Sequence, residues 1–457
     1  MSAEEVPLRK KLSFAVGNIG GLAIGQSSIL LLYTYYFLYL GVPLSPIGIS
    51  LILVVYGVWD AFNEPLIGHL SDFTRTRIGR RKPFILIGII PLIICSYLIY
   101  TPPTGNAVFT TIYLIIVLVL YETFVTMVIT IWYSIFPELS IDQTERLTIS
   151  KYLQIFGVFG LIFGLGIAPM IAGTFSDPLV GYSLMGLILG GITALSMVPT
   201  LLFIKEKKEY QISDKEKWGF LESLKIASKN KSFRYFVLVQ FLLQLSYSVV
   251  LSSLPLFFEG VLGLDSSQWS ILLLLIFLTI IPSLYLWMKI AEKRGTQKAL
   301  LMSMIVFCAV FPLVFIVFNA MTMLIVLLLG GVGLSGLMMF PTVLLSDVID
   351  EDQVQTNKRR EGVFNGVSGV IVKLSNSISW LILGIVIEMF RIDRNNLSPS
   401  NLTILNELGL RILVGLIPVI ILIFGMYFLY RYPLIGLYLD DIKQKVIQIH
   451  KSLPEKG

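Results

Sequence analysis

The segment from Leu12 to Trp59 reads LSFAVGNIGGLAIGQSSILLLYTYYFLYLGVPLSPIGISLILVVYGVW and contains 48 residues without a charge. A single helix of this length would run about 72 Å. The hydrocarbon core of a bilayer is only about 30 Å thick. The chain must therefore fold back once, and the turn is expected at Gly41, Pro43 and Pro46. A second uncharged run, from Ala299 to Ser346, predicts the same behaviour, with its break near Asn319.

The composition agrees with a membrane protein. Hydrophobic residues make up 55% of the 457 residues and charged residues only 14%, against roughly 25% charged in soluble domains. Long uncharged runs predict spanning helices and exclude a β-barrel. Two cysteines and two histidines lie far apart, so we expect no disulfide framework, no cofactor and no metal beyond a coupling cation.

The hydrophobic runs predict an all-α membrane protein with twelve transmembrane helices. The expected spans are 12–40, 46–69, 83–101, 108–136, 150–174, 181–204, 233–258, 267–290, 298–318, 321–346, 361–388 and 408–431.

The longest polar break, Lys205 to Lys231, predicts the domain organisation. We expect an N-terminal six-helix bundle at 1–204, a cytoplasmic linker at 205–232, a C-terminal six-helix bundle at 233–432 and an amphipathic cytoplasmic tail at 433–457. The loop from Gly68 to Lys82 has a weak counterpart from Lys289 to Lys298. This similarity predicts a duplicated unit with pseudo-twofold symmetry and a binding site between the halves.

The distribution of Lys and Arg predicts the orientation. Of 35 such residues, Arg391, Arg394 and Arg411 fall on one side and Lys373 lies inside a span, which leaves 35 − 3 − 1 = 31 on the other side. Because Lys and Arg are enriched in the cytoplasmic loops of membrane proteins, both termini are expected in the cytoplasm. The protein is expected to be a multi-pass protein of the plasma membrane. The net charge of +6 then reflects topology and requires no nucleic-acid partner. Asn401 begins a glycosylation sequon on the outer side.

Asp60, Asn63 and Glu64 fall on or near one face of a helix that otherwise belongs in lipid. Two carboxylates at this spacing repel each other and are costly to desolvate. They are explained by a cation between them or by protonation. The pattern therefore indicates transport coupled to Na⁺ or H⁺. The alternative is a purely structural role, in which these residues form a hydrogen-bonded network between helices.

The motif from Trp59 to Gly68, continued by Arg77-Ile-Gly79-Arg-Arg-Lys82-Pro-Phe84, resembles the glycoside–pentoside–hexuronide:cation symporters of the major facilitator superfamily. Further similarity lies at Pro137-Glu138 with Glu145-Arg146, and from Ser346 to Lys373. The resemblance implies the major facilitator fold. It also implies that Thr126 joins Asp60, Asn63 and Glu64 in the cation site, with Lys373 close by.

This chain departs from the sugar-binding relatives at three charged positions, which read Gly20-Gly21-Leu22, about Ile129, and Leu153 or Gln154. Glu122 is a second candidate coupling residue beside Lys373, as a proton carrier or a substrate contact. Lys373 could also simply neutralise the carboxylates. Aromatic and amide residues that could bind the solute are Gln26, Tyr33, Trp132, Tyr133, Gln154, Gln244, Tyr247, Asn376 and Trp380.

Charged residues at the cytoplasmic helix ends are interpreted as gate residues that form and break ion pairs during alternating access. They are Asp72, Arg77, Arg80, Arg81, Glu138, Arg146, Asp347, Arg360 and Glu361. Arg75 is interpreted as a plain surface charge.

The function predicted from these patterns is cation-coupled symport of a small polar solute, a sugar or glycoside, by a protein expected to be monomeric. The alternatives are a lysophospholipid:cation symporter and a non-transporting sensor on the same fold. An enzyme is not expected, because the chain contains no H-E-x-x-H, G-x-S-x-G or Walker A motif.

Overall fold

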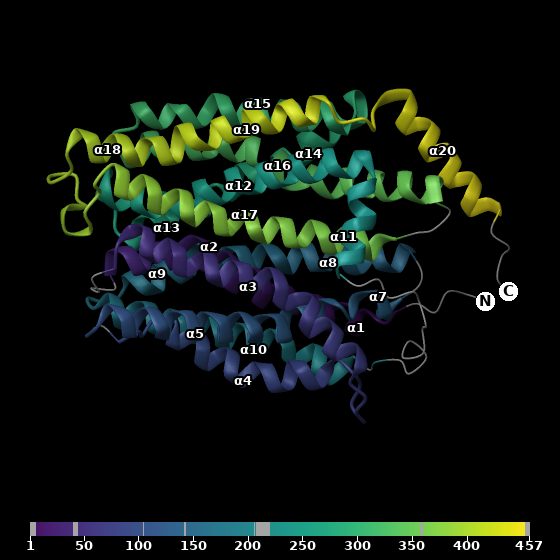
Figure 1. Ribbon diagram of the computed structural model, residues 1–457, viewed down its shortest axis with the longest axis horizontal. Coiled ribbons are helices and arrows are strands. Elements are labelled where there is room, and N and C mark those ends of the chain that lie inside the picture. Colours follow the sequence, from purple (N-terminus) through teal and green to yellow (C-terminus); the bar gives the residue numbers. More distant parts are fainter. Residues whose placement is uncertain are drawn as a thin grey trace. The chain divides into compact units, whose positions relative to one another are not determined.

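The computed structural model describes residues 6–39, 44–103, 105–140, 143–204, 206, 220–356 and 360–452. In these ranges the regular structure is helical, apart from an isolated bridge between Thr76 and Gly79. Long helices account for most of the ribbon in Figure 1.

Eleven helices of the described chain are long and apolar enough to cross a membrane. A further apolar helix, Lys82–Leu98, has 17 residues, which is at the lower limit of about 17 for a spanning helix. Eleven and one make twelve, and each predicted span overlaps one of these helices. The prediction of an all-α membrane protein is therefore confirmed.

Contacts divide the chain into two compact units. Unit 1 comprises 1–215, 254–274 and 380–402, and unit 2 comprises 216–253, 275–379 and 403–457. Three helices continue from one unit into the other: α12 (Lys231–Gly260), α13 (Ser266–Leu275) and α17 (Glu361–Met389). The predicted domain boundaries, which lie at the linker, stay a prediction.

The remaining helices of unit 1 come from the N-terminal half, except for one short turn. They are α1 (Leu8–Ala15), α2 (Gly17–Thr34), η1 (Tyr35–Tyr39), α3 (Pro46–Phe73), α4 (Lys82–Leu98), α5 (Ala107–Val125), η2 (Thr126–Thr130), α6 (Ile131–Tyr133), α7 (Phe136–Leu139), α8 (Gln143–Leu161), η3 (Ile162–Ile167), α9 (Ala168–Gly173), α10 (Pro178–Phe203) and η6 (Arg394–Asn396).

The remaining helices of unit 2 come from the C-terminal half. They are α11 (Phe220–Lys229), α14 (Phe277–Arg294), α15 (Thr296–Val310), η5 (Phe311–Ile316), α16 (Ala320–Thr356), α18 (Ile404–Arg411), η7 (Ile412–Leu416), α19 (Ile417–Tyr430) and α20 (Gly436–Ser452).

Close helix packing in unit 1 depends on small residues. Helix α10 packs against both α2 and α4, and Figure 1 shows α10 beside α4. At Gly186 of α10, a β-carbon would collide with the carbonyl oxygen of Ser96 in α4. Small residues allow such contact between backbones, which is how helices in lipid gain packing energy.

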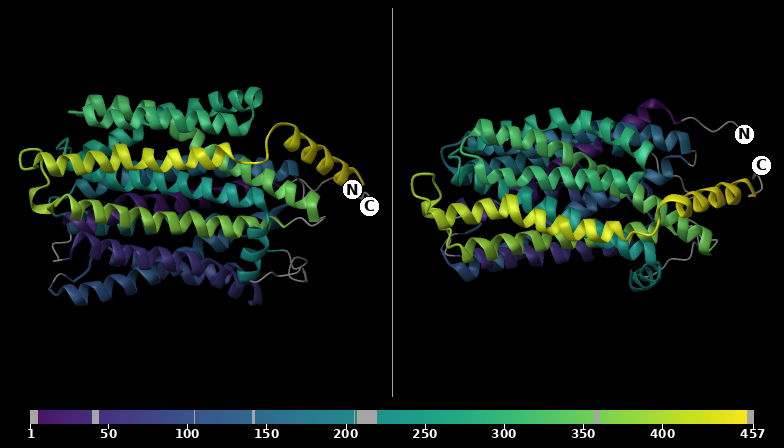
Figure 2. Two further views of the ribbon diagram at one scale, coloured as in Figure 1. Left: turned by 45° about the horizontal axis from the view of Figure 1, so that its top comes forward. Right: turned by 90° about the horizontal axis from the view of Figure 1, so that it is seen from above.

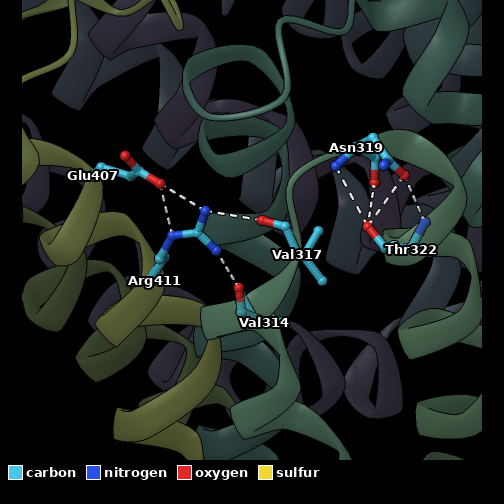
Figure 3. A network of polar contacts seen from close by, with 6 residues as sticks. All are labelled: Val314, Val317, Asn319, Thr322, Glu407 and Arg411. Carbon is cyan, nitrogen blue, oxygen red and sulfur yellow. Dashed lines mark hydrogen bonds and ion pairs between the residues drawn. The ribbon is translucent and has the colours of Figure 1, made fainter.

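The two breaks predicted inside the uncharged runs coincide with helix starts. Ser45 caps α3, because its hydroxyl accepts from the Gly48 N–H at 3.0 Å, and Pro46 occupies the first turn. Asn319 precedes α16, and its side-chain oxygen accepts from the Thr322 N–H at 2.9 Å (Figure 3). Both helix starts are therefore capped locally, while Gly41 and Pro43 of the first predicted break lie outside the described residues.

Helix α16 corrects one predicted boundary. It continues to Thr356, ten residues beyond the predicted end at 346. The extension packs against α20, which follows α19 after a bend (Figure 2). Ile442 and Val446 of α20 are buried, and the Tyr438 hydroxyl donates to Glu351 Oε1 at 2.8 Å. Burial against α20 explains why the acidic segment of α16 remains a helix.

Candidate functional site

The predicted cation residues of α3 meet α5 and η2 inside unit 1. Asn63 is fully buried, and its Nδ2 donates to the Glu122 carbonyl oxygen at 3.1 Å and to Thr126 Oγ1 at 2.8 Å. A carbonyl can only accept, so these two bonds fix the orientation of the amide. Asn63 Oδ1 then receives no donor from the described part of the chain. A buried acceptor without a donor is costly, and a bound cation would satisfy it.

Glu122 lies beside this amide. Its side chain is 5% exposed, and Oε2 accepts from the Tyr56 hydroxyl at 2.8 Å. Tyr56 is one turn before Asp60 on α3, and Asp60 is within electrostatic range of the Tyr56 phenol. Glu122 is therefore held in the protein interior beside the predicted cation residues, rather than directed toward water.

Glu64 contacts the same neighbouring helix one turn further along. Its Oε1 accepts from Thr130 Oγ1 at 2.9 Å. Thr126 and Thr130 are the first and last residues of η2, a π-helical segment. Such segments widen a helix and frequently occur at functional sites. Pro65 follows Glu64 within α3 and cannot donate a backbone hydrogen bond to Ala61.

The site thus combines carboxylate, amide and hydroxyl oxygens on two adjacent helical segments. Hard cations such as Na⁺ prefer oxygen ligands of this kind. Asp60 and Glu64 are each half-buried. A cation would offset both their repulsion and the cost of removing them from water. The arrangement can therefore bind a small cation or, alternatively, exchange a proton at a carboxylate.

The predicted solute residues of unit 1 differ in their surroundings. The Trp132 ring is 1% exposed, stacks on Phe14 at 4.8 Å and donates from Nε1 to Thr200 Oγ1 at 3.2 Å. These contacts are those of a packing residue, and its solute contact stays a prediction. Tyr33 is buried and donates to the Pro46 carbonyl oxygen at 3.3 Å.

Three further solute candidates of unit 1 are not enclosed in this way. Tyr133 and Gln154 are exposed, and Gln26 is half-buried. A fourth, Trp380, lies in the segment of α17 that belongs to unit 1. It packs 5.8 Å from Tyr56, and its buried Nε1–H has no acceptor among the described residues. Trp380 is therefore a polar donor next to the cation residues.

In unit 2, the amide candidates form a ladder between α12 and α17. Gln244 Nε2 donates to Asn376 Oδ1 at 3.3 Å, and Ser248 donates to the same oxygen at 2.6 Å. Tyr247 and Lys373 lie on these two helices and are half-buried. The ladder gives two spanning helices a shared polar face, as expected of either a binding surface or interhelical hydrogen bonding.

Known proteins resemble this chain over nearly its whole length. The sequence profile of the MFS/sugar transport protein family matches residues 13–435. The chain belongs to this family. A protein of Synechocystis sp., named an uncharacterized symporter, is 23% identical over 98% of this chain and 98% of its own length. A sodium-dependent lysophosphatidylcholine symporter of Danio rerio is 22% identical over 93% of this chain and 85% of its own length.

Solved structures agree on the fold. A crystal structure of the nucleoside transporter NupG matches with a TM-score of 0.66 at 14% identity, over 92% of this chain and 99% of that one. The chain is thus a multi-pass membrane transporter with the major facilitator fold, and not an enzyme.

Several of the predicted gate residues stabilise local structure through hydrogen bonds. The backbone N–H groups of Arg80, Arg81 and Lys82 donate to the Glu206 carboxylate at 2.8 to 3.2 Å, which satisfies the start of α4. Arg81 also donates from its guanidinium to the Ser134 carbonyl. Arg77 and Arg75 are exposed.

In unit 2, Arg360 pairs with Asp352 through two bonds of 2.9 and 2.5 Å. Asp347 is 3.6 Å from the Lys443 ammonium of α20. The remaining gate predictions concern side chains that lie outside the described residues, namely those of Asp72, Glu138, Arg146 and Glu361.

Sequence reasoning missed several partners that complete these sites. Tyr56 lies four residues before Asp60, and Thr130 lies four residues after Thr126, so helical spacing could have identified both. Helical spacing could not have identified Glu206, because only tertiary folding brings it to α4. It could not have identified Asp352 either, because several neighbouring carboxylates were equivalent candidates for pairing with Arg360.

Proposed function

We propose that this chain is a sodium-coupled symporter of the glycoside–pentoside–hexuronide:cation type. The observation that carries the proposal is the buried Asn63 Oδ1 without a donor, beside Thr126 and between two carboxylates of α3. The sodium dependence named for several relatives supports Na⁺ over H⁺.

In this proposal the cation binds to oxygens of Asp60, Asn63, Glu64 and Thr126. Entry of Na⁺ neutralises one negative charge and supplies the missing partner of the amide oxygen. Glu122 and Lys373 are coupling residues whose charges respond to occupancy of the cation site. Because the cation binds one conformation more favourably than the other, its gradient biases the transport cycle.

The solute remains a choice between two classes. A sugar or glycoside agrees with the amides and aromatics of α12 and α17. A lysophospholipid is favoured by a specific observation: Ile129 packs against the helix at Gly21, where relatives that bind sugars carry charges. Several sodium-dependent lysophosphatidylcholine symporters among the relatives support the second class.

Uptake into proteoliposomes tests the proposal. Labelled glycosides and lysolipids would be offered under an imposed Na⁺ gradient and, separately, under an imposed H⁺ gradient. We expect uphill accumulation of one compound with the Na⁺ gradient alone. Accumulation driven only by H⁺ would contradict sodium coupling, and saturable binding without accumulation would indicate a sensor.

A pair of threonines of α5 and η2 provides a matched control. Thr126→Val removes a hydroxyl that accepts from Asn63, whereas Thr123→Val removes one that already serves Trp59 and the Val119 carbonyl. We expect Thr126→Val and Asp60→Asn to abolish the sodium dependence of uptake. Thr123→Val should retain the sodium dependence. Equal loss in both threonine variants would mean that the loss comes from disturbed helix packing and not from the cation site.

A further inference from the structure

Glu259 joins three segments of unit 1. It is the penultimate residue of α12 and is half-buried. Its Oε2 accepts from the Tyr39 hydroxyl at 2.7 Å, and its Oε1 accepts from Trp269 Nε1 at 3.3 Å. Tyr39 is the last residue of η1, and Trp269 is a fully buried residue of α13. Both oxygens of the carboxylate therefore bond to other helical segments.

The bond between Tyr39 and Glu259 links residues that are 220 positions apart. Tyr39 lies at the end of the first predicted span, 12–40, and Glu259 directly follows the seventh, 233–258. Because the N-terminus is expected in the cytoplasm, both spans end on the side predicted to be extracellular. The two halves of such a transporter separate on this side when it opens outward. The bond must then break.

Two further contacts in unit 1 join the predicted second and eleventh spans on the same side. Ser50 of α3 is fully buried and donates to the Trp380 carbonyl at 2.7 Å, and the Ile47 N–H donates to Glu388 Oε2 at 3.3 Å. The parts of α12, α13 and α17 that belong to unit 1 are the ends predicted to be extracellular. Within unit 1, these ends pack with helices of the N-terminal half.

The surroundings of Glu259 contain no cationic partner among the described residues. The ion pairs of this part of the chain do not include it. The titratable groups that face it are Tyr39 of η1, Tyr182 of α10 and Asp265, which directly precedes α13. None of these groups carries a positive charge. The protonation state of Glu259 therefore sets the charge at the junction of η1 and α12.

We propose that Glu259 is a proton-sensitive latch on the extracellular side: its carboxylate keeps this side closed, and protonation loosens it. Hydrogen bonds to an ionised acceptor are roughly twice as strong as those between neutral groups. Protonation removes this advantage at both Tyr39 and Trp269, so low external pH favours separation of the extracellular ends. The latch goes beyond the proposed symport and does not depend on the identity of the cation or of the solute.

Labelling of a buried cysteine from outside tests the latch. Ser50→Cys places a reporter thiol beneath the extracellular closure, in a protein whose Cys95 and Cys308 are replaced by alanine. Intact cells would be treated with a membrane-impermeant maleimide at external pH of about 8 and of about 5, a range in which partly buried carboxyl groups titrate. Variants are compared at the same pH, so the pH dependence of the thiol reaction cancels. The same protein without Ser50→Cys gives the background.

Glu259→Gln imitates the protonated carboxyl group. At pH of about 8, the reporter thiol should react about fivefold faster in this variant than in the reporter protein with Glu259 intact. At pH of about 5 the two rates should be equal, because Glu259 is then protonated. Equal rates at both pH values would refute the latch. A ratio that stays raised at both would show that the latch does not sense protons.

Two tyrosines of η1 provide matched variants. Tyr39→Phe removes the bond to Glu259, whereas Tyr36→Phe removes a bond of 3.0 Å to the Ile99 carbonyl, inside the N-terminal half. Tyr39→Phe should accelerate labelling more at pH of about 8 than at pH of about 5, and Tyr36→Phe should leave it unchanged. Equal effects of both variants would assign the change to loosened packing and overturn the proposal.

The tyrosine pair keeps the latch testable even where Glu259→Gln does not fold. The labelling experiment applies neither a solute nor a sodium gradient. Failure of the symport proposal is therefore distinguishable from failure of the latch, because Asp60→Asn should abolish sodium-dependent uptake and leave the pH dependence of labelling intact. Loss of this pH dependence in Asp60→Asn would contradict the assignment to Glu259.

Discussion

Two polar clusters lie in otherwise apolar helices, and they differ in whether their polar atoms have partners. In unit 2, each of the three nitrogens of the Arg411 guanidinium group donates to Glu407 or to the carbonyl of Val314 or Val317 (Figure 3). The centre of the Phe318 ring lies 5.4 Å from the guanidinium carbon. In unit 1, Asn63 donates twice but its buried oxygen receives no donor within the described chain.

The difference indicates what each cluster does. A buried charge whose bonds are all made holds one structure and has no capacity left for a ligand. A buried acceptor left open has a cost in stability, which a ligand can recover on binding. We therefore expect substitutions in the Arg411 cluster to affect stability, and those in the Asn63 cluster to affect transport.

The largest effect is expected for Arg411→Leu. It removes all the guanidinium bonds, including those to the carbonyls of Val314 and Val317, so stability should fall by about 3 kcal/mol, the upper end of the range for losing a hydrogen bond to a charged group. Glu407→Gln should cost less, because the Glu407 side chain is 39% exposed. Thermal unfolding in detergent measures both effects. An unchanged melting temperature for Arg411→Leu would contradict the claim that the Arg411 cluster stabilises the fold.

The next effect concerns Asn63→Ala. We expect the Na⁺ concentration for half-maximal uptake to rise about tenfold or more, which corresponds to about 1.4 kcal/mol of binding energy. The melting temperature should change little, because the loss of two hydrogen bonds is offset by removal of an unsatisfied oxygen. Sodium titration of uptake checks this, and a collapse in stability without a change in Na⁺ affinity would assign Asn63 to structure.

A smaller effect is expected for Tyr56→Phe. The ring can still pack, but Glu122 loses the hydroxyl donor at 2.8 Å. We expect a loss of stability of about 1 kcal/mol and a transport defect that depends on external pH, since the carboxyl group loses a partner that favours its ionised form. Uptake measured across a pH series is the readout. A uniform decrease at all pH values would mean that Glu122 does not participate in coupling.

The smallest effect on stability is expected for Trp380→Phe. This change removes a buried N–H that has no acceptor among the described residues and keeps an aromatic ring beside Tyr56. Stability should therefore stay within about 0.5 kcal/mol or improve. The KM for the solute should nevertheless rise if the indole N–H binds it. Trp132→Phe is the contrasting variant, because its N–H already bonds Thr200 and its loss should affect folding first.

Local patterns predicted much of the fold. The uncharged runs and their capping residues gave the spans, because hydrophobicity and turn chemistry act over a few residues. The same patterns placed the end of α16 too early, since the acidic segment continues the helix and α16 packs against α20, which is far away in the sequence. The spacing of Asp60, Asn63 and Glu64 likewise predicted a shared face, since helical periodicity is a local property.

By itself, therefore, the sequence determined that this is a twelve-span helical transporter with carboxylates at an unusual place in α3. Only the tertiary structure decided which atoms there lack partners, because a hydrogen bond between α3 and η2 depends on how two distant segments pack. It also decided that the Trp132 N–H bonds Thr200 while the Trp380 N–H has no acceptor among the described residues, and that Arg391 has a positive φ. Trp132 and Trp380 are the same residue type, and they differ because folding gives them different neighbours.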